Sequence, residues 1–247
     1  MTLFDLYKPQ VQIDNPIRLI ELFAGYGSQA MALRNLGADF ETYRVYEIDK
    51  YAMASYNAIH GTDFKPTDIC DIHGVDMEIV DKHIHTYILT YSFPCTDISV
   101  AGRMAGMAED SNTRSSLLWQ VKRILEELNE IDSLPQILLM ENVPAIHSPQ
   151  NMEHYSKWVG FLNELGYSSY SEDLNAVDFG VAQNRERTFL VSILGEYAYT
   201  FPTGMELTKC IEDYFEELTE EMAEKYVVKS PKALELLVRL DEENRLE

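Results

Sequence analysis

Short apolar runs alternate along this chain with stretches in which apolar residues recur at helical spacing. The runs have the length and composition of buried strands and cover residues 17–22, 43–48, 87–91, 137–140 and 189–194. Helical spacing occupies residues 28–36, 52–59, 115–129 and 152–165. This alternation predicts an α/β fold in which a mostly parallel sheet carries helices on both faces.

The residues that follow each apolar run are candidates for a site, because ligands of such sheets bind beyond the carboxyl ends of the strands. The first run leads into Phe23-Ala24-Gly25-Tyr26-Gly27-Ser28, a glycine-containing turn that would let the backbone approach a ligand. Glu47 lies where an acid binds the ribose of a nucleoside cofactor, and Asp68 could meet an adenine amine. Each feature alone is more often packing or surface, but three in order at successive strand ends favour a nucleoside site.

Cys95 follows Pro94 in the loop after the run at residues 87–91. A free cysteine is more often a small buried hydrophobic residue, which is the reading we give Cys70 and Cys210. Cys95 differs because its loop lies at the functional edge of the predicted sheet, where the local field can favour the thiolate. Thiolate addition to an aromatic ring builds electron density at the neighbouring carbon, so Cys95 is a candidate nucleophile.

Charged residues follow or precede the last two apolar runs. Glu141 stands at the end of the run at residues 137–140, where a carboxyl is more often a structural cap but could also bond or protonate a ring nitrogen beside a nucleophile. Arg185 and Arg187 are two positions apart on extended chain and so project to the same side. They could clamp a phosphate or fix Glu141 and a base, and the structural alternative is a surface ion pair with Glu186.

Composition changes this picture in one respect. The 247 residues, 46% of them hydrophobic, suffice for one well-cored domain, but 20 basic against 41 acidic residues give a net charge of −21. That sign is wrong for a protein that grips phosphates by itself. Either nucleic acid is not the substrate, or the surface that holds it is local or lies on another chain.

The cysteine spacing and the hydropathy pattern exclude some further classes of protein. Three separated cysteines have neither metal-ligand spacing nor a disulfide framework, so we expect no metal and a reducing, cytoplasmic compartment. No membrane-length apolar run and no signal-peptide pattern are found in the sequence, so we expect no membrane association.

The acidic content rises towards the end of the chain. We predict a catalytic domain over residues 1–204 and an acidic helical extension over residues 205–247, in which Ser230-Pro231 separates two helix-prone pieces. A solvated tail and a linker or partner-docking segment are equally good interpretations of this extension.

Taken in order, the motifs FAGYG, YEID, TDI, SFPC, MENV and QNRER resemble the motif series of the C5-cytosine-specific DNA methyltransferases over residues 17–195. The resemblance implies a Rossmann-like domain that binds S-adenosylmethionine. Ile48 occupies a place beside the adenine that an aromatic residue often fills in the family. The cofactor-binding positions that the resemblance implies are Phe23, Gly25, Gly27, Glu47, Ile48, Asp68, Ile69 and Pro94.

The resemblance also implies a catalytic set. Cys95 would add to C6 of a cytosine, Glu141 would contact N3, and Arg187 with Arg185 would orient the base and stabilise the adduct. Methyl transfer to C5 would be followed by loss of the C5 proton and release of Cys95. Because these atoms are hidden in double-stranded DNA, the cytosine would be flipped into the pocket.

Two departures from the family pattern shape the hypothesis. The usual glycine pair appears here as Gly27-Ser28, and after Leu194 we find neither a target-recognition region nor the last family motif. We therefore expect a second polypeptide to supply both, together with most of the basic surface, in a prokaryotic modification system or for phage self-protection.

Three rival interpretations stay open. The first keeps the chemistry and makes RNA the substrate of a cytosine-C5 methyltransferase. The second is a non-catalytic, cofactor-binding subunit, although Cys95, Glu141 and Arg187 together argue against lost chemistry. The third, a dinucleotide oxidoreductase, is disfavoured because the GxGxxG pattern is missing and because Cys95 follows a proline.

Overall fold

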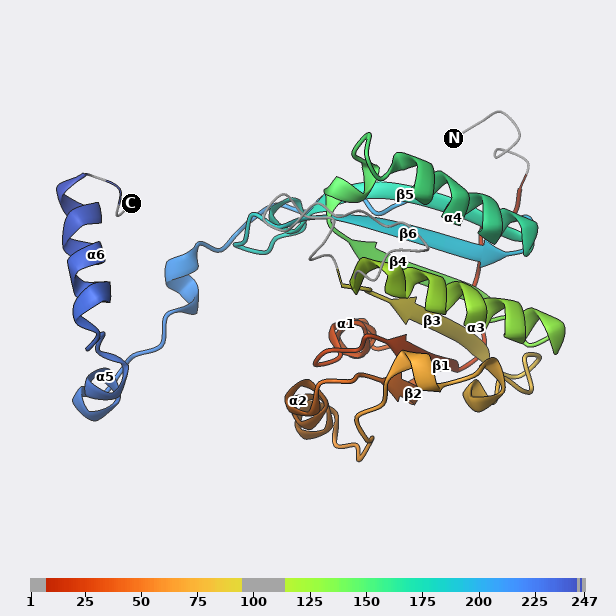
Figure 1. The fold of residues 1–247 in the computed structure, drawn as a ribbon, viewed down its shortest axis with the longest axis horizontal. Helices are drawn as coiled ribbons and strands as arrows, with labels where there is room; N and C mark the ends of the chain where they lie inside the picture. The colour runs from red at the N-terminus through yellow and green to blue at the C-terminus, as the bar shows by residue number, and fades with distance from the viewer. Residues whose placement is uncertain (1–7, 95–113, 244, 246–247) are drawn as a thin grey trace. The chain divides into compact units, whose positions relative to one another are not determined.

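A computed structural model describes residues 8–94, 114–243 and 245 of the chain. The chain divides into two compact units, Met1–Glu206 and Leu207–Glu247. The larger unit contains a six-stranded sheet with strand order β2-β1-β3-β4-β6-β5 (Figure 1). Its strands are β1 (Ile17–Leu22), β2 (Phe40–Tyr46), β3 (Thr86–Tyr91), β4 (Ile137–Asn142), β5 (Tyr167–Asn175) and β6 (Glu186–Leu194).

The first four strands are parallel, whereas β6 runs antiparallel to both β4 and β5. The chain leaves β1 towards β2 on one side and returns to β3 on the other, so the strand order reverses at β1. Ligands of open α/β sheets bind at such a switch point, beyond the carboxyl ends of the strands. The topology therefore directs attention to the loops that follow β1, β2 and β3.

Helices cover both faces of the sheet, which confirms the predicted α/β architecture. The helices of this unit are α1 (Ser28–Asn35), α2 (Lys50–His60), α3 (Leu118–Glu130) and α4 (Met152–Glu164). Alternate residues of β1 point to opposite faces: Ile20 joins the core formed with α3 and α4, and Leu19 joins the core formed with Ala30 of α1. Short 3-10 turns complete the connections: η2 (Ile69–Asp71), η3 (Gly74–Met77), η4 (Arg114–Leu117), η5 (Pro144–His147) and η6 (Ala176–Asp178).

Strand β5 is absent from the sequence-based prediction. Its sequence, YSSYSEDLN, is polar, and only Tyr167 among its residues is buried. The strand lies at the edge of the sheet, where it pairs with β6 along its whole length from Tyr167–Leu194 to Asn175–Glu186. Its conformation follows from this pairing and not from an apolar pattern, which explains why the pattern did not predict it.

The smaller unit contains η7 (Ile211–Tyr214), α5 (Glu220–Tyr226) and α6 (Pro231–Glu242). Helices α5 and α6 lie on either side of Ser230, as the two helix-prone pieces predict, and Pro231 occupies the first turn of α6. Among the residues described in this unit none is buried. Across the described ranges of both units, no helix is long and apolar enough to cross a membrane.

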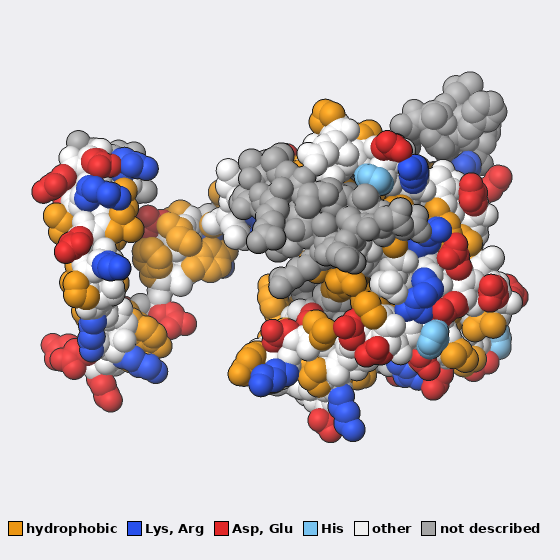
Figure 2. Space-filling view, in the orientation of Figure 1, with side chains coloured by type: hydrophobic (Ala, Val, Ile, Leu, Met, Phe, Trp, Pro, Cys, Tyr) orange, Lys and Arg blue, Asp and Glu red, His pale blue; other side chains and the backbone are white. Residues whose placement is uncertain are grey.

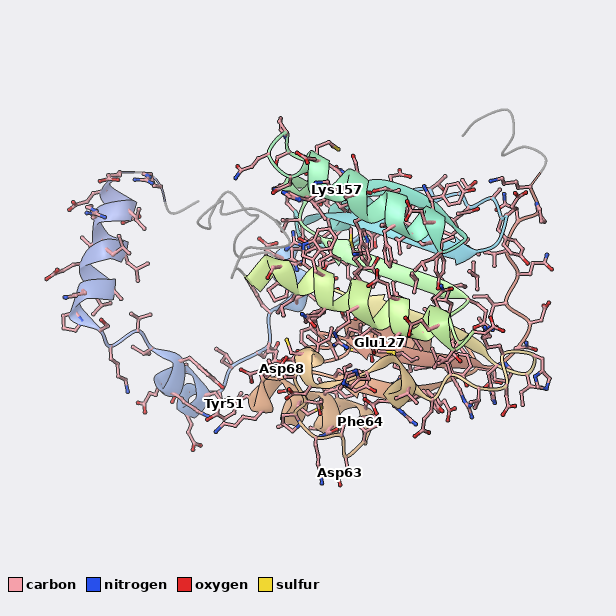
Figure 3. All side chains as sticks on the ribbon, turned by 45° about the vertical axis from the view of Figure 1, so that its right-hand side comes forward. Tyr51, Asp63, Phe64, Asp68, Glu127 and Lys157 are labelled. Atoms are coloured by element: carbon pink, nitrogen blue, oxygen red, sulfur yellow. The ribbon has the colours of Figure 1, made fainter. Side chains whose placement is uncertain are left out.

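Glu127 of α3 ties the η3 segment to the core (Figure 3). Its carboxylate accepts the backbone N–H of Gly74 at 2.7 Å and pairs with Arg123 at 2.8 Å and with His73 at 3.1 Å. Burial opposes ionisation of the carboxyl, but the bond from Gly74 and the contacts with Arg123 and His73 outweigh it and lower the pKa of Glu127 to about 2.

We predict that Glu127→Gln lowers the free energy of unfolding at pH 7 by about 1 kcal/mol, because the charge-assisted bonds are lost while the surface exposure of the site limits the effect. A carboxyl whose pKa is lower in the folded state stabilises the fold above its unfolded pKa, about 4.3, and this contribution fades as the pH falls towards 2. Urea denaturation at pH 7 and pH 3 should therefore show a difference that shrinks in acid. Glu126→Gln, which removes the more exposed neighbour paired with Lys122, is the control and should change little at either pH.

Candidate active site

The turn after β1 is built on left-handed backbone. Phe23, Gly25 and Gly27 have φ angles of 57°, 56° and 84°, a conformation that glycine adopts freely and that is uncommon for a residue such as phenylalanine. A Cβ at Gly25 would meet no atom within 4 Å, so open space lies beside this backbone. The turn leads directly into the N-terminus of α1, which attracts polar or negative groups.

Glu47, which follows β2, lies against this turn. One oxygen of its carboxylate accepts the N–H of Gly25 at 3.0 Å and the other accepts the N–H of Asp49 at 2.8 Å. The structure thus brings Gly25 and Glu47 together as the sequence predicts. The half-buried carboxylate keeps lone pairs that could accept the hydroxyls of a ribose.

The segment after α2 is held against the same edge, because the N–H of Thr67 donates to the carbonyl of Glu47 at 2.8 Å. Asp68 (Figure 3) begins η2, and its carboxylate caps that turn by accepting the N–H of Cys70 at 2.9 Å. The side chain of Ile69 is buried in the core, whereas Ile48 is 65% exposed. The open space at Gly25, the carboxylate acceptor of Glu47 and the carboxylate of Asp68 at the start of η2 together fit a nucleoside cofactor.

Helix α2 contacts β1 through a buried pair, Glu21 and Tyr56, and contacts the turn through the less buried His60. Glu21 of β1 is fully buried and accepts a hydrogen bond from the hydroxyl of Tyr56 in α2. His60, one helical turn further on, is 3.0 Å from the carbonyl of Tyr26 through Nε2 and 2.8 Å from Arg34 through Nδ1. Burial raises the pKa of Glu21 to about 7, against the opposing effect of the hydrogen bond from Tyr56.

Glu21 is not among the residues predicted from the sequence. The signal that could have found it is an acid inside an otherwise apolar strand, IRLIEL. Such an acid must have a polar partner in the core, because burying an unpaired charge is costly. Tyr56 is that partner, and the pair connects the first strand to the helix that follows Glu47.

Cys95 lies outside the described residues, and its predicted role stays a prediction. Pro94 is half-buried, and Phe93, just before it, is buried in the core that includes Tyr91 and Met140. The described chain therefore anchors the start of the Pro-Cys loop at the carboxyl end of β3.

Glu141 and Arg187 meet across strands β4 and β6. Arg187 Nε lies 3.0 Å from Glu141 Oε1, and the two side chains are 22% and 23% exposed. The contact arises because β6 is antiparallel to β4, so that β6 begins at the edge where β4 ends. The second guanidinium nitrogen of Arg187 donates to the carbonyl of Glu186 at 2.6 Å, so the predicted alternative of a side-chain ion pair with Glu186 is not what Arg187 forms.

Arg185 has a different position. It precedes the first residue of β6, its side chain is exposed, and its backbone N–H donates to Asn175 at 3.0 Å. The structure places Arg187, and not Arg185, against Glu141. The alternation rule that put both arginines on one side holds only inside a strand, and Arg185 lies just outside it.

Three further polar residues, Asn142, Thr188 and Asp173, lie in register across β4, β6 and β5. Asn142 is 3% exposed and bonds to the carbonyl of Phe93, while the buried Thr188 donates to Asp173. The MENV motif already contains Asn142, but an amide inside a strand pattern gives no sign of its partner. Within the described ranges, no group of three or more His, Cys, Asp or Glu residues could hold a metal ion.

Comparison with known proteins identifies the class. The family model described as C-5 cytosine-specific DNA methylase matches residues 17–244. Type II methyltransferase M2.ScrFI of Lactococcus lactis subsp. cremoris is 34% identical over 262 residues, covering 87% of this chain and 71% of the relative. Type II methyltransferase M.HhaI of Haemophilus parahaemolyticus is 34% identical over 200 residues, covering 80% of this chain and 56% of the relative. The chain therefore belongs to the C-5 cytosine-specific DNA methylase family.

The members of this family are S-adenosylmethionine-dependent DNA (cytosine-5) methyltransferases, so the cofactor expected from the motifs is the methyl donor of the family. Solved structures confirm the Rossmann-like fold. The Entamoeba histolytica methyltransferase EhMeth has a TM-score of 0.66 and 16% sequence identity, covering 84% of this chain and 62% of its own. Schizosaccharomyces pombe Dnmt2 has a TM-score of 0.56 and 22% sequence identity, covering 79% of this chain and 52% of its own. The family model extends to residue 244 and thus beyond Leu194 and the QNRER motif that precedes it.

We predict that Gly27→Ala weakens both the fold and cofactor binding. A Cβ at Gly27 would lie 2.4 Å from His60 Nε2 and 2.6 Å from the ring of Tyr56, in addition to the cost of a φ of +84°. Gly61→Ala is the matched control, because Gly61 has a φ of +68° but nothing within 4 Å of its Cβ position. Both variants should lose about 1 kcal/mol through backbone strain, and Gly27→Ala about 1–3 kcal/mol more through the clash. Urea denaturation and calorimetric titration with S-adenosylhomocysteine measure the two effects, and equal losses in the two variants would contradict the clash.

Proposed function

We propose that this chain is the cofactor-binding and catalytic part of a DNA (cytosine-5) methyltransferase that acts through a covalent adduct on Cys95. The observation that carries the proposal is the Glu141–Arg187 pair at the edge of the sheet where β3 leads into Phe93-Pro94. A carboxyl group held in place by a guanidinium can donate a hydrogen bond or proton to a ring nitrogen, and Cys95 comes next in the chain after Pro94. The Gly25–Glu47 contact lies on the same edge, at the end of the neighbouring strand β1.

Each catalytic residue has a role that its chemistry can fill. The Cys95 thiolate forms a bond to C6 of cytosine, and the ring electrons move towards C5 while the protonated carboxyl of Glu141 donates a hydrogen bond to N3. Arg187 holds the Glu141 carboxyl in place, and Arg185 adds positive charge near the base. S-adenosylmethionine supplies an electrophilic methyl group for C5. Loss of the C5 proton then returns electrons to the ring, and the bond from C6 to Cys95 breaks.

The cofactor contacts divide into backbone and side-chain contributions. Phe23, Gly25 and Gly27 shape the turn around the cofactor, and Glu47 accepts the ribose hydroxyls. Asp68, the exposed Ile48 and Ile69 would hold the adenine, and Pro94 would line the site on the side of the Pro-Cys loop.

The test of this function is covalent capture by DNA that contains 5-fluorocytosine, in which fluorine at C5 blocks the step that releases the enzyme. We expect Cys95→Ala to abolish both capture and methyl transfer, by several orders of magnitude, because the nucleophile is gone. Cys70 and Cys210 are exposed, and so the interpretation of both as small buried residues was wrong. Cys70→Ala, which removes the exposed cysteine in η2, should leave both capture and methyl transfer unchanged. Electrophoresis under denaturing conditions detects the adduct. Capture of Cys95→Ala, or transfer of labelled methyl to RNA in place of DNA, would overturn the proposal.

We further propose that a second polypeptide supplies the target-recognition region and the last family motif. Two observations support it: the chain spans only 56% of M.HhaI and 42% of the orphan methyltransferase M.SssI of Spiroplasma monobiae, and its net charge is −21. On the described part of the face in Figure 2, red acidic and blue basic side chains are interspersed rather than gathered into a basic patch. A protein that neutralises phosphates needs such a patch from some source.

This partner proposal makes its own prediction. The purified chain alone should transfer labelled methyl to genomic DNA slowly and without sequence preference, because under this proposal the surface that reads bases and binds phosphates belongs to the partner. Adding a purified polypeptide that spans the recognition region and last motif of M2.ScrFI should raise the rate. Bisulfite sequencing of the product reports preference, and rapid methylation of one defined sequence by the chain alone would contradict the proposal.

A further inference from the structure

We propose that Asn142 is a positioning residue. Its side chain fixes the Phe93–Pro94 peptide next to the end of β4, which carries Glu141, and thereby sets where the nucleophile meets the base. This inference rests on the proposed function and assigns a task to a side chain that has none in it. Asn142 is 3% exposed, and its Nδ2 donates to the carbonyl of Phe93 at 3.1 Å. Its Oδ1 accepts the N–H of Val143 at 2.9 Å.

The bond from Asn142 stands where the sheet itself no longer connects the two strands. The last paired residues of β3 and β4 are Tyr91 and Met140. Phe93 and Asn142 each lie two positions beyond that pair, so the side-chain amide continues the connection after the backbone ladder has ended. An amide side chain can donate to one peptide and accept from another, which an ionised carboxylate cannot do.

Asn142 is itself held from the other side. It pairs with Thr188 of β6, the residue after Arg187, and Thr188 pairs with Asp173 of β5 and donates a hydrogen bond to it. Asp173 also lies 3.5 Å from His147. A row of paired polar residues thus crosses β4, β6 and β5, buried at Asn142 and Thr188 and exposed at Asp173, and it links the Asn142 strand end to two neighbouring strands.

The chemistry explains why such a bond is needed. One cytosine ring must receive a bond at C6 and a contact at N3 at the same time, and the two groups come from loops and strand ends of different strands. A displacement of about 1 Å in one of them can lower a rate by about 10²-fold. The Asn142 amide joins the two supporting segments directly, so their spacing does not depend on either loop alone.

The test compares Asn142→Asp with Asn151→Asp. Aspartate keeps the size of asparagine but cannot donate to the Phe93 carbonyl. Asn151 is a matched control, because it is 2% exposed and its Nδ2 also donates to a backbone carbonyl, that of Ala145 at 2.9 Å, in the η5 segment. We expect Asn142→Asp to lower kcat about 10²-fold while the KM for S-adenosylmethionine stays unchanged, and Asn151→Asp to alter kcat less than about threefold. Equal losses in both variants would overturn the inference.

A second measurement needs no DNA. The rate of alkylation of Cys95 by iodoacetamide, followed by peptide mass spectrometry across pH 6–10, reports the thiol pKa. A carboxylate at position 142 should raise the Cys95 midpoint, because a nearby negative charge disfavours the thiolate, and should leave the exposed Cys70 and Cys210 unchanged as internal references. An unchanged Cys95 profile would overturn the inference.

The two measurements separate this inference from the proposed function. If the native chain captures no 5-fluorocytosine, the proposed function fails, and the alkylation profile still decides on Asn142. Titration with S-adenosylhomocysteine checks the fold of each variant. If Asn142→Asp does not bind S-adenosylhomocysteine, Asn142→Ala, which adds no charge, replaces that variant in the kinetic comparison, with Asn151→Ala as its control. The expected loss of kcat and the result that would overturn the inference stay the same.

Discussion

Hydrogen bonding between parallel strands is the constraint on which the site depends. The ladder from β2 through β1 and β3 to β4 aligns the carboxyl ends of four strands at one edge. Side chains distant in sequence, Glu47 after β2 and Glu141 at the end of β4, therefore face the same region without any contact between them being needed. The reversal of strand order at β1 leaves the edge open beside Gly25, where a cofactor can enter.

The antiparallel strand β6 adds what parallel strands cannot. A parallel neighbour of β4 would bring its carboxyl end to the same edge, whereas β6 brings its first residues there. Arg187, near the start of β6, can thus contact Glu141, while most of the following residues of β6 are buried in the sheet. The base of the pair is rigid because Thr188 and Leu190, on the same strand, are buried.

The sequence predicted the fold class for a definite reason. Strands β1, β3, β4 and β6 are buried on one or both faces, and so their apolar runs stand out. The sequence predicted a nucleoside site that includes Gly25 and Glu47, and the structure shows a hydrogen bond between these two residues. Strand β5 was missed because its pairing partner, and not its composition, determines its conformation. The contacts of Glu21 and Asn142 were missed because a polar side chain inside a strand does not reveal which distant group it meets.

The buried carboxyl of Glu21 has a consequence for the fold as a whole. Its pKa of about 7 is above that of an unfolded glutamate, so the folded chain holds a proton that the unfolded chain releases between about pH 4.5 and 7. Glu21 therefore makes the protein less stable as the pH rises through that window, in contrast to the surface carboxylates that carry hydrogen bonds. The ionisation state of Glu21 therefore bears on the buried contact between the first strand and α2, which Glu21 makes through the hydroxyl of Tyr56.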